Sequence, residues 1–378
     1  QNQQGTEYDN VDLNNQDAVD PTYTPISSVE GFSDVTDRKL SNKLGLMIAA
    51  GIISVPEDGR FNPSDKMSRY DFLELIVNSV GIKPDEVYSP ALDGFYDVSR
   101  DDYRNKVLSV SAKYGIINGY GDNSFRGGDN VEYNDAVTMM MRASGYDEYA
   151  KYEGGYPSGY LKAAKRCGIG TNPKDKTSLT RAEAVELIFQ WLESPVLETV
   201  STGFSRDDKR TVLYIHHNIL KDNGVVNATS RDTVSDLRVE KGTVCIGKNR
   251  YRDSDERYNS YLGYKVDCYY NEAKSGPSDI VYIGIDDGVK ILTIEADNYL
   301  GYSADTIKYY EKDKVKTASV DSLSKYIVNG FVSSETSIAK ILDMKEGAIT
   351  LISNDGGGTY STVFVNKYEN IFLKSIAY

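Results

Sequence analysis

An internal repeat constrains this chain more than any other feature of its sequence. Phe32-Ser-Asp-Val recurs as Phe95-Tyr-Asp-Val, and Gly51-Ile-Ile recurs 64 residues later at Gly115. A looser third copy contains Gly168-Ile-Gly and follows sooner because its middle loop is shorter. Tandem copies are typical of folds in which small, similar units stack and bury a shared core. We therefore expect three related units in the first half of the chain.

Each copy predicts two amphipathic helices. The first helix has apolar residues at i, i+4, i+7 and i+8 and is followed by Gly51, which favours a C-cap. Those apolar residues are Leu40, Leu44, Met47 and Ile48. Thr180 and Glu183 form a capping box before the closing helix of copy three, and Ser68 with Asp71 forms a weaker one in copy one.

One helix pair of this size cannot bury its apolar face alone, so the copies should share a core. Their expected bounds are residues 31–82, 95–146 and 156–193, the third being shortened. Before them, residues 1–30 hold six acids and no Lys or Arg, which predicts an extended acidic arm. We expect a neighbour, either the β-rich half or another copy of the chain, to hold this arm.

After Ser194-Pro195 the pattern changes to short β-branched and aromatic runs between turn residues, which predicts strands. The expected strands are residues 211–215, 243–246, 264–270, 280–283, 291–294, 348–352 and 361–365. The last two flank a glycine-rich turn and predict a hairpin. The fold class is thus α+β and multidomain: a helical repeat bundle, then a β-rich domain at 200–335 and a terminal hairpin region at 336–378 that belongs to the same module or forms a second part.

Charge and composition exclude several classes of partner. The formal net charge is −13 and no basic run is present, so nucleic acid and anionic lipid are poor partners. The longest uncharged apolar stretch, residues 44–55, is too short to span a bilayer, so no membrane insertion is expected. The chain starts at Gln1 without a leader, and we expect a removed signal peptide, with an excerpt of a longer protein as the alternative.

Histidine and cysteine limit the chemistry. The two histidines, His216 and His217, are adjacent, and on a strand they would face opposite sides of a sheet. Cys245 and Cys268 lie in strand-like runs and either form a disulfide or remain thiols, and Cys167 stands apart.

No nucleophile elbow, Cys–His pair, His-rich metal motif or P-loop occurs in the sequence, so we expect no enzyme. No cofactor is expected either. The turn at Asn354-Asp355 offers too few oxygens for calcium, although a calcium ion between subunits stays open.

Taken in order, the motifs Phe-x-Asp-Val, Gly-Ile-Ile, Gly-Tyr-x-Asp-x-x-Phe and Thr-Arg-Ala-Glu resemble the S-layer homology (SLH) domain in three tandem copies over residues 31–193. The resemblance implies a pseudo-threefold bundle whose grooves bind a secondary cell-wall polysaccharide, typically one capped by a pyruvate ketal. It implies a secreted protein of the cell wall or S-layer. The β-rich half more loosely resembles the C-terminal region of SLH-bearing surface proteins of Gram-positive anaerobes.

Arg181 of the Thr-Arg-Ala-Glu motif points to an anionic ligand. A cation in the first turn of a helix opposes the helix dipole, and a bound carboxylate would explain its presence there. A salt bridge to Asp34 or Asp97 of a neighbouring repeat is the alternative. Copy one keeps Arg69, but copy two has Tyr133 in this position, so at least one groove should be degenerate.

The candidate polymer-binding residues are Asp34, Ser68, Arg69, Asp97, Tyr103, Thr180 and Arg181. Helix capping alone explains Thr180 and Ser68 equally well. Tyr103 corresponds to Leu40 in copy one and Tyr156 in copy three, and either stacks on a sugar or packs in the bundle. The expected function is a non-catalytic structural protein, anchored by the repeats, whose β-rich half assembles with other copies into a homopolymeric layer or filament. An anchored adhesin and an anchored polysaccharide-active enzyme are the alternatives.

Overall fold

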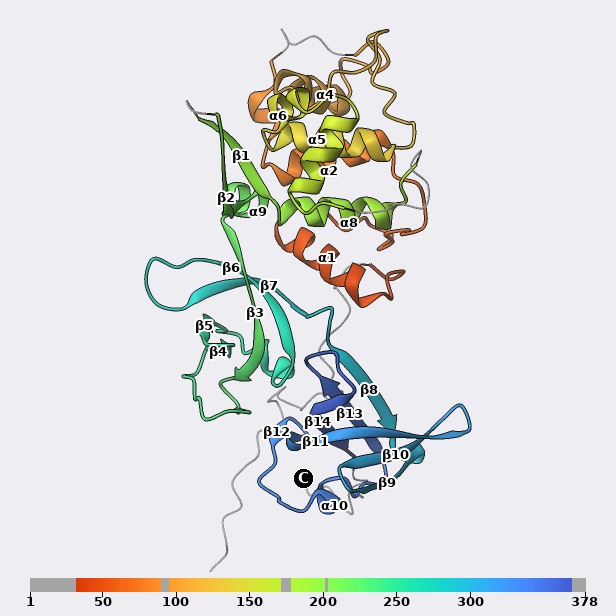
Figure 1. Ribbon diagram of the computed structural model, residues 1–378, viewed down its shortest axis with the longest axis vertical. Helices are drawn as coiled ribbons and strands as arrows, with labels where there is room; N and C mark the ends of the chain where they lie inside the picture. Colours follow the sequence, from red (N-terminus) through yellow and green to blue (C-terminus); the bar gives the residue numbers. More distant parts are fainter. Residues whose placement is uncertain (1–31, 90–94, 171–177, 201–202, 369–378) are drawn as a thin grey trace, which may run out of the picture. The chain divides into compact units, whose positions relative to one another are not determined.

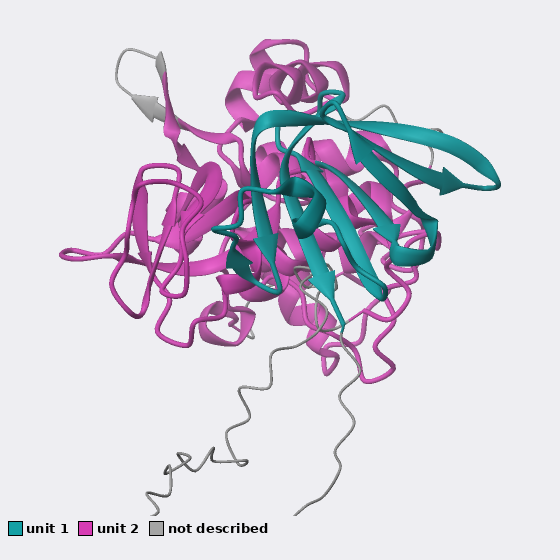
Figure 2. Cartoon of the chain, turned by 90° about the horizontal axis from the view of Figure 1, so that it is seen from below, with its two compact units in different colours: residues 1–25, 290–378 teal, residues 26–289 magenta. Residues whose placement is uncertain are grey.

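The computed structural model describes residues 32–89, 95–170, 178–200 and 203–368 (Figure 1). The predicted arm, residues 1–30, lies outside this part of the chain. Two compact units meet in the sequence between Val289 and Lys290. In chain order they are the first and the second unit; Figure 2 draws the first in magenta (its unit 2) and the second in teal (its unit 1). Within the described residues, no helix is both long and apolar enough to cross a membrane.

The first half is α-helical, as predicted. Its helices are α1 (Arg38–Ala49), α2 (Arg69–Ser79), α3 (Pro84–Val87), α4 (Tyr103–Lys113), α5 (Tyr133–Ala143), α6 (Asp147–Tyr152), α7 (Ser158–Arg166) and α8 (Arg181–Leu192). The predicted pairs are α1 with α2, α4 with α5, and α7 with α8. Fully buried residues of all three pairs, among them Leu44, Val137 and Trp191, belong to one hydrophobic core. The shared core expected from the repeat is therefore present.

The closing helices begin where the sequence predicts. The Ser68 hydroxyl accepts a hydrogen bond from the Asp71 amide, and Thr180 with Glu183 forms a complete capping box. Both interactions satisfy backbone N–H groups that a helix N-terminus would otherwise leave unpaired. In α5, Glu132 stands at the cap without a side-chain hydrogen bond to the helix.

Three backbone hydrogen bonds join the residues that precede the closing helices into a ring. The amide of Met67 donates to the carbonyl of Leu179 (2.9 Å), Leu179 donates to Val131 (3.0 Å), and Val131 donates to Met67 (2.8 Å). Because each residue donates to one neighbour and accepts from the other, the three segments are arranged cyclically. The starts of α2, α5 and α8 are thereby placed around a common centre.

A hairpin and a short helix follow the bundle. The hairpin consists of β1 (Pro195–Val200) and β2 (Gly203–Thr211), and α9 spans Val212–His217. The prediction of a strand at 211–215 is wrong, and both histidines lie on α9 instead. The Thr211 hydroxyl accepts from the Tyr214 amide (3.1 Å) and starts a helix, which Asn218 ends with a left-handed φ of 55°.

A closed barrel completes the first unit. Its strands are β3 (Ile219–Ala228), β4 (Thr243–Ile246), β5 (Asn249–Arg252), β6 (Lys265–Asn271) and β7 (Ser278–Ile285), in the order β3-β4-β5-β7-β6, with the 3-10 turn η1 (Asn259–Tyr261) before β6. Cys245 on β4 and Cys268 on β6 are buried free thiols, and Cys167 is also free. The disulfide considered from the sequence is therefore absent. Burial raises the pKa of Cys268, so this thiol stays protonated at neutral pH.

The second unit is a mixed sheet with the strand order β8-β13-β14-β11-β10-β9, and β12 pairs with β11. Its elements are β8 (Lys290–Glu295), η2 (Ala296–Asn298), β9 (Tyr299–Ser303), β10 (Thr306–Glu311), β11 (Lys314–Val328), β12 (Phe331–Val332), α10 (Ile338–Ile341), β13 (Gly347–Ser353) and β14 (Thr359–Lys367). The predicted hairpin is the antiparallel pair β13–β14. The Asp355 carboxylate accepts from the Ser353 hydroxyl and the Gly357 amide, so it closes the turn. The β-rich half divides at residue 290, whereas the sequence suggested a division near 335.

Candidate polymer-binding grooves of the helical bundle

Arg69 opens α2 and extends into the neighbouring helix pair. Its Nε donates to the carbonyl of Phe125 (3.2 Å), and its Nη1 forms an ion pair with Asp135. The guanidinium lies over the rings of Phe125 (4.9 Å to the centroid) and Tyr120 (5.0 Å). Only 7% of the Arg69 surface is exposed, and these cation–π and ionic contacts offset the cost of burying its charge.

Arg181 opens α8 and repeats this arrangement between the third helix pair and the first. Its Nε donates to the carbonyl of Phe61 (2.7 Å), and its guanidinium lies over the Phe61 ring at 5.0 Å. Its Nη1 is 3.7 Å from a carboxylate oxygen of Asp71. Each arginine therefore pairs with the acidic residue at the third position of the next closing helix. Bridges between neighbouring repeats exist, but their acids are Asp71 and Asp135 instead of the predicted Asp34 and Asp97.

Asp34 and Asp97 hold the loops on which the arginines rest. Asp34 accepts from the amides of Phe61 (2.8 Å) and Asn62 (2.7 Å), and Asp97 accepts from those of Phe125 (3.0 Å) and Arg126 (2.7 Å). The hydrogen bond from the Phe61 amide is the main cause that lowers the pKa of Asp34. These two aspartates thus position the phenylalanine carbonyls that bind Arg181 and Arg69.

Each arginine lies in a groove. The Arg69 groove has a volume of about 300 Å³ and is lined by Ile116, Ile117, Tyr120, Asp135, Arg142 and Tyr156, among others. The Arg181 groove has a volume of about 280 Å³ and is lined by Ile52, Ile53, Asp71, Glu74, Leu75 and Asn78, among others. The Arg181-groove residues just named correspond, 64 positions later, to Ile116, Ile117, Asp135, Thr138, Met139 and Arg142 of the Arg69 groove, so the grooves are equivalent sites of two repeats. Tyr120 and Tyr156 have no such counterpart in the lining of the Arg181 groove.

The two grooves differ in charge. The Arg69 groove contains a second arginine, Arg142, which also pairs with Asp147 outside the groove (3.2 Å). The corresponding position in the Arg181 groove is Asn78, and Glu74 replaces Thr138 there. Burial, followed by the charge of Asp71, raises the pKa of Glu74. The Arg69 groove is therefore the better site for an anion.

The tyrosines of the next helix pair border the grooves. Tyr156 lines the Arg69 groove and donates to Asp135 (2.9 Å). Partial burial and this hydrogen bond raise the pKa of Tyr156 to about 12, so the phenol stays neutral. Tyr103 is 46% exposed, and burial, then Asp85 and Glu74, raises its pKa. Glu74 belongs to the Arg181 groove, whereas Tyr103 is not one of the residues that line it.

Sequence reasoning brought Arg69 and Arg181 forward as site residues but missed most of the groove lining. The missed polar residues are Asp71, Glu74, Asp135 and Arg142, whereas Tyr156 is the counterpart of Tyr103 that the sequence had already indicated. Asp71 and Asp135 occupy the same position in two repeats, and this recurrence could have marked them as site residues. Glu74 and Arg142 differ from the residues at the equivalent positions, so the repeat did not mark them. Ser68 and Thr180 engage in capping, and Tyr133 stands at the helix start where the other two pairs have arginine.

Comparison with known proteins agrees with this geometry. The S-layer homology domain family matches residues 32–73 and 94–136. The chain is 24% identical over 363 residues to a cell surface protein of Thermoanaerobacter kivui, covering 90% of this chain and 43% of that protein. It is 24% identical over 170 residues to the middle cell wall protein of Brevibacillus brevis, covering 44% of this chain and 16% of that protein.

An enzyme is also among the relatives. The chain is 25% identical over 182 residues to an amylopullulanase of Thermoanaerobacterium thermosulfurigenes, covering 43% of this chain and 9% of the enzyme. The chain thus spans less than half the length of each of these relatives. The family matches cover α1, α4 and the loops that follow them, and they reach into the closing helices α2 and α5 as far as residues 73 and 136. Glu74, Asn78, Arg142, Tyr156 and Arg181, which also line the grooves, lie outside the matched residues. The chain therefore carries S-layer homology repeats and is a cell-wall-associated protein of the bacterial surface.

Proposed function

We propose that the helical bundle anchors this chain, without a covalent bond, to a secondary cell-wall polysaccharide held in the Arg69 and Arg181 grooves. The observation that carries the proposal is the equivalence of the two grooves, each with an arginine stacked on a phenylalanine ring. Residues 156–193 act as a third repeat in the same bundle. The closed hydrogen-bond ring through Met67, Val131 and Leu179 supports this assignment.

The ligand chemistry follows from the guanidinium groups. Among the described residues, the hydrogen bonds and ion pair of Arg69 engage Nε and Nη1. A guanidinium has five N–H donors in a planar fork, so capacity remains for a ligand carboxylate. A pyruvate ketal supplies such a carboxylate on a saccharide. Tyr156, which is 57% exposed, borders the same groove and offers a ring face for the sugar.

Beyond anchoring, we propose a non-catalytic structural role in which the β-rich half joins copies of the chain into a layer. Support comes from the Thermoanaerobacter kivui cell surface protein, which matches across both halves, and from a surface layer protein of Brevibacillus choshinensis, 25% identical over 133 residues. The alternative is an anchored enzyme. It is favoured by the amylopullulanase and by an exoglucanase of Acetivibrio thermocellus, whose matches cover 43% and 32% of this chain.

The decisive experiment compares sedimentation of the full chain with purified walls before and after removal of the pyruvate ketal. A charge-assisted contact contributes about 1.5–3 kcal/mol, so removal should weaken binding roughly ten- to a hundredfold. Equal binding to both wall preparations would contradict carboxylate recognition. Loss of binding to walls stripped of all secondary polysaccharide is the matching positive control.

A further inference from the structure

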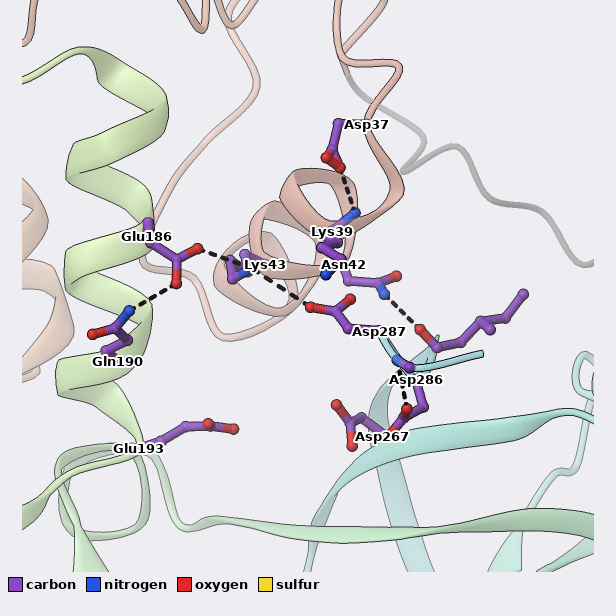
Figure 3. A network of polar contacts seen from close by, with 12 residues as sticks. Asp37, Lys39, Asn42, Lys43, Glu186, Gln190, Glu193, Asp267, Asp286 and Asp287 are labelled. Atoms are coloured by element: carbon purple, nitrogen blue, oxygen red, sulfur yellow. Dashed lines mark hydrogen bonds and ion pairs between the residues drawn. The ribbon is translucent and has the colours of Figure 1, made fainter. Parts of the chain in front are cut away.

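The third closing helix presents its groove-forming positions to the barrel. The sixth and tenth residues of α2 (Glu74 and Asn78) and of α5 (Thr138 and Arg142) line the two grooves. In α8 those positions are Glu186 and Gln190, which line a polar cavity of about 260 Å³. The cavity is completed by α1 and by barrel residues on β3, β6 and β7 and directly after β7 (Figure 3). A second part of the fold thus lies where the other pairs have an open groove.

Two lysines link the bundle to the barrel across this cavity. Lys43 of α1 lies 3.0 Å from Glu186 and 3.8 Å from Asp287, which follows β7. Only 11% of the Lys43 side chain is exposed. Lys221 of the barrel lies 2.9 Å from Glu193, at the end of α8, and 3.3 Å from Asp267 of β6. Each lysine therefore bridges one carboxylate of the bundle and one of the barrel.

At the same contact, a glycine of α1 lets the side chain of Tyr282 approach the helix closely. A Cβ on Gly45 of α1 would lie 2.4 Å from the Tyr282 ring, which leaves no room for any side chain. Asn42 donates to the carbonyl of Ile285 (2.8 Å) and accepts from the Tyr282 hydroxyl (3.2 Å). Tyr269 of the barrel belongs to the bundle's hydrophobic core and donates to Glu193 (2.7 Å). The contact is packed and hydrogen-bonded like an interior.

The repeat pattern supplies an independent observation. Arg181 reaches the groove of the first pair and Arg69 that of the second. The residue at the equivalent helix start of α5 is Tyr133, so the third pair lacks the corresponding cation.

We propose that this face of the third helix pair is the docking face of the barrel, so that the chain offers two polymer-binding grooves instead of three. The number of polymer-binding grooves rests on the proposed function, because it assumes that the Arg69 and Arg181 grooves bind polymer. The docking itself rests on the contacts of α1 and α8 with the barrel. Polymer and barrel would compete for the α8 face, and the barrel, joined to it covalently, prevails.

Hydrogen exchange of the full chain, with and without a pyruvate-ketal-capped fragment of the wall polysaccharide, tests both parts. Bound fragment should slow exchange in the two grooves, at residues 71–78 and 135–142, and leave residues 186–190 unchanged. Slower exchange at 186–190 on binding would overturn the proposal. If no segment responds to the fragment, the proposed function fails, and the docking is then judged by the variants alone.

The variant Gly45→Leu should force α1 and β7 apart and speed exchange at residues 186–190 by about tenfold or more. Gly128→Leu is the matched control, since a Cβ there meets no atom within 4 Å. Glu193→Gln, which weakens the contacts of Lys221 and Tyr269, provides a milder variant should Gly45→Leu fail to fold. If the folded Gly45→Leu and Glu193→Gln variants exchange hydrogen at residues 186–190 as slowly as the wild-type chain does, the proposed docking is wrong.

Discussion

Arg69 and Arg181 stand in the first turn of a helix, where the helix dipole disfavours a cation. The structure shows what offsets this cost: each guanidinium binds a carbonyl, a carboxylate and an aromatic face of the next helix pair. The arginines thereby join the helix pairs and at the same time line the grooves. In the proposed function, anchoring and cohesion of the bundle thus depend on the same two side chains.

Replacing these arginines should weaken wall binding unequally. The Arg69 groove also holds Arg142 and has Thr138 where the other groove has the acidic Glu74. Arg69→Ala should therefore lower the affinity for cell walls about ten- to a hundredfold, and Arg181→Ala should lower it less. Sedimentation with purified walls measures this, and Tyr133→Ala is the control that should bind nearly as well as wild type. Undiminished binding of the Arg69/Arg181 double variant, with native circular dichroism, would refute the assignment.

Arg69→Lys separates charge from geometry. An ammonium keeps the positive charge but cannot form a planar fork or stack as a guanidinium does, so binding should stay impaired. The measurement is the same sedimentation series on walls that carry the pyruvate ketal. Full recovery by lysine would mean that the groove senses charge alone.

Asp34 provides a pH-dependent prediction. Its folded pKa is lowered, chiefly by the Phe61 amide, so its contribution to stability is present above its unfolded pKa of about 4 and is lost as the pH falls through the folded pKa. Asp34→Ala should therefore lower the melting temperature at pH 7, and this difference should shrink as the pH falls below about 4. Thermal unfolding followed by circular dichroism checks it; a difference that does not change with pH would exclude the carboxylate as its cause.

At the scale of elements, short local signals decide where the helices begin. The capping box at Thr180 and the cap at Ser68 start α8 and α2 at the predicted places. The same kind of cap at Thr211 turns a β-branched run into α9. Local capping can therefore outweigh strand propensity over one or two turns.

Thr180→Ala should destabilise the chain by about 1 kcal/mol through loss of the cap, whereas Thr180→Ser should retain most of the stability. Urea unfolding of the full chain measures both. Because the Thr180 hydroxyl engages the Glu183 amide and carboxylate, wall binding should change little in either variant. A large loss of binding at native stability would instead make Thr180 a ligand contact.

At the scale of the whole molecule, the bundle and the barrel form one compact unit and the last sheet forms another. The contacts of α1 and α8 with the barrel tie the first of these together. The last sheet, residues 290–367, has its own hydrophobic core, which includes Ile307, Leu351 and Val363. A structural role in a layer would place anchoring in the first unit and leave the second for contacts between copies.

Deleting residues 1–30 should reduce assembly while leaving wall binding intact. The candidate polymer-binding residues all lie outside residues 1–30, and by its composition the acidic arm suits contact with another chain. Electron microscopy of the purified protein and wall sedimentation measure the two effects separately. Polymers of the truncated chain as abundant as those of the full chain would show that the arm is not an interchain clasp.

Much of the fold was determined by the sequence itself, because its signals are local. Apolar periodicity, caps and the glycine-rich turn specify the helix pairs and the β13–β14 hairpin within a few residues of each position. The 64-residue recurrence likewise identified Arg69 as a site residue and Tyr133 as the exception. Only the strand at 211–215, where a cap competes with β propensity, was placed wrongly.

Only the tertiary structure decided which groups meet. That Arg69 binds Asp135, that Asp34 holds a loop for Arg181, and that Glu186 meets Lys43 depends on packing between segments far apart in the chain. Closure of the barrel and division of the β-rich half at residue 290 depend on strand pairing, which no single strand specifies. Long-range pairing is chosen by the total burial and hydrogen bonding of the whole fold, so it cannot be read from any local segment.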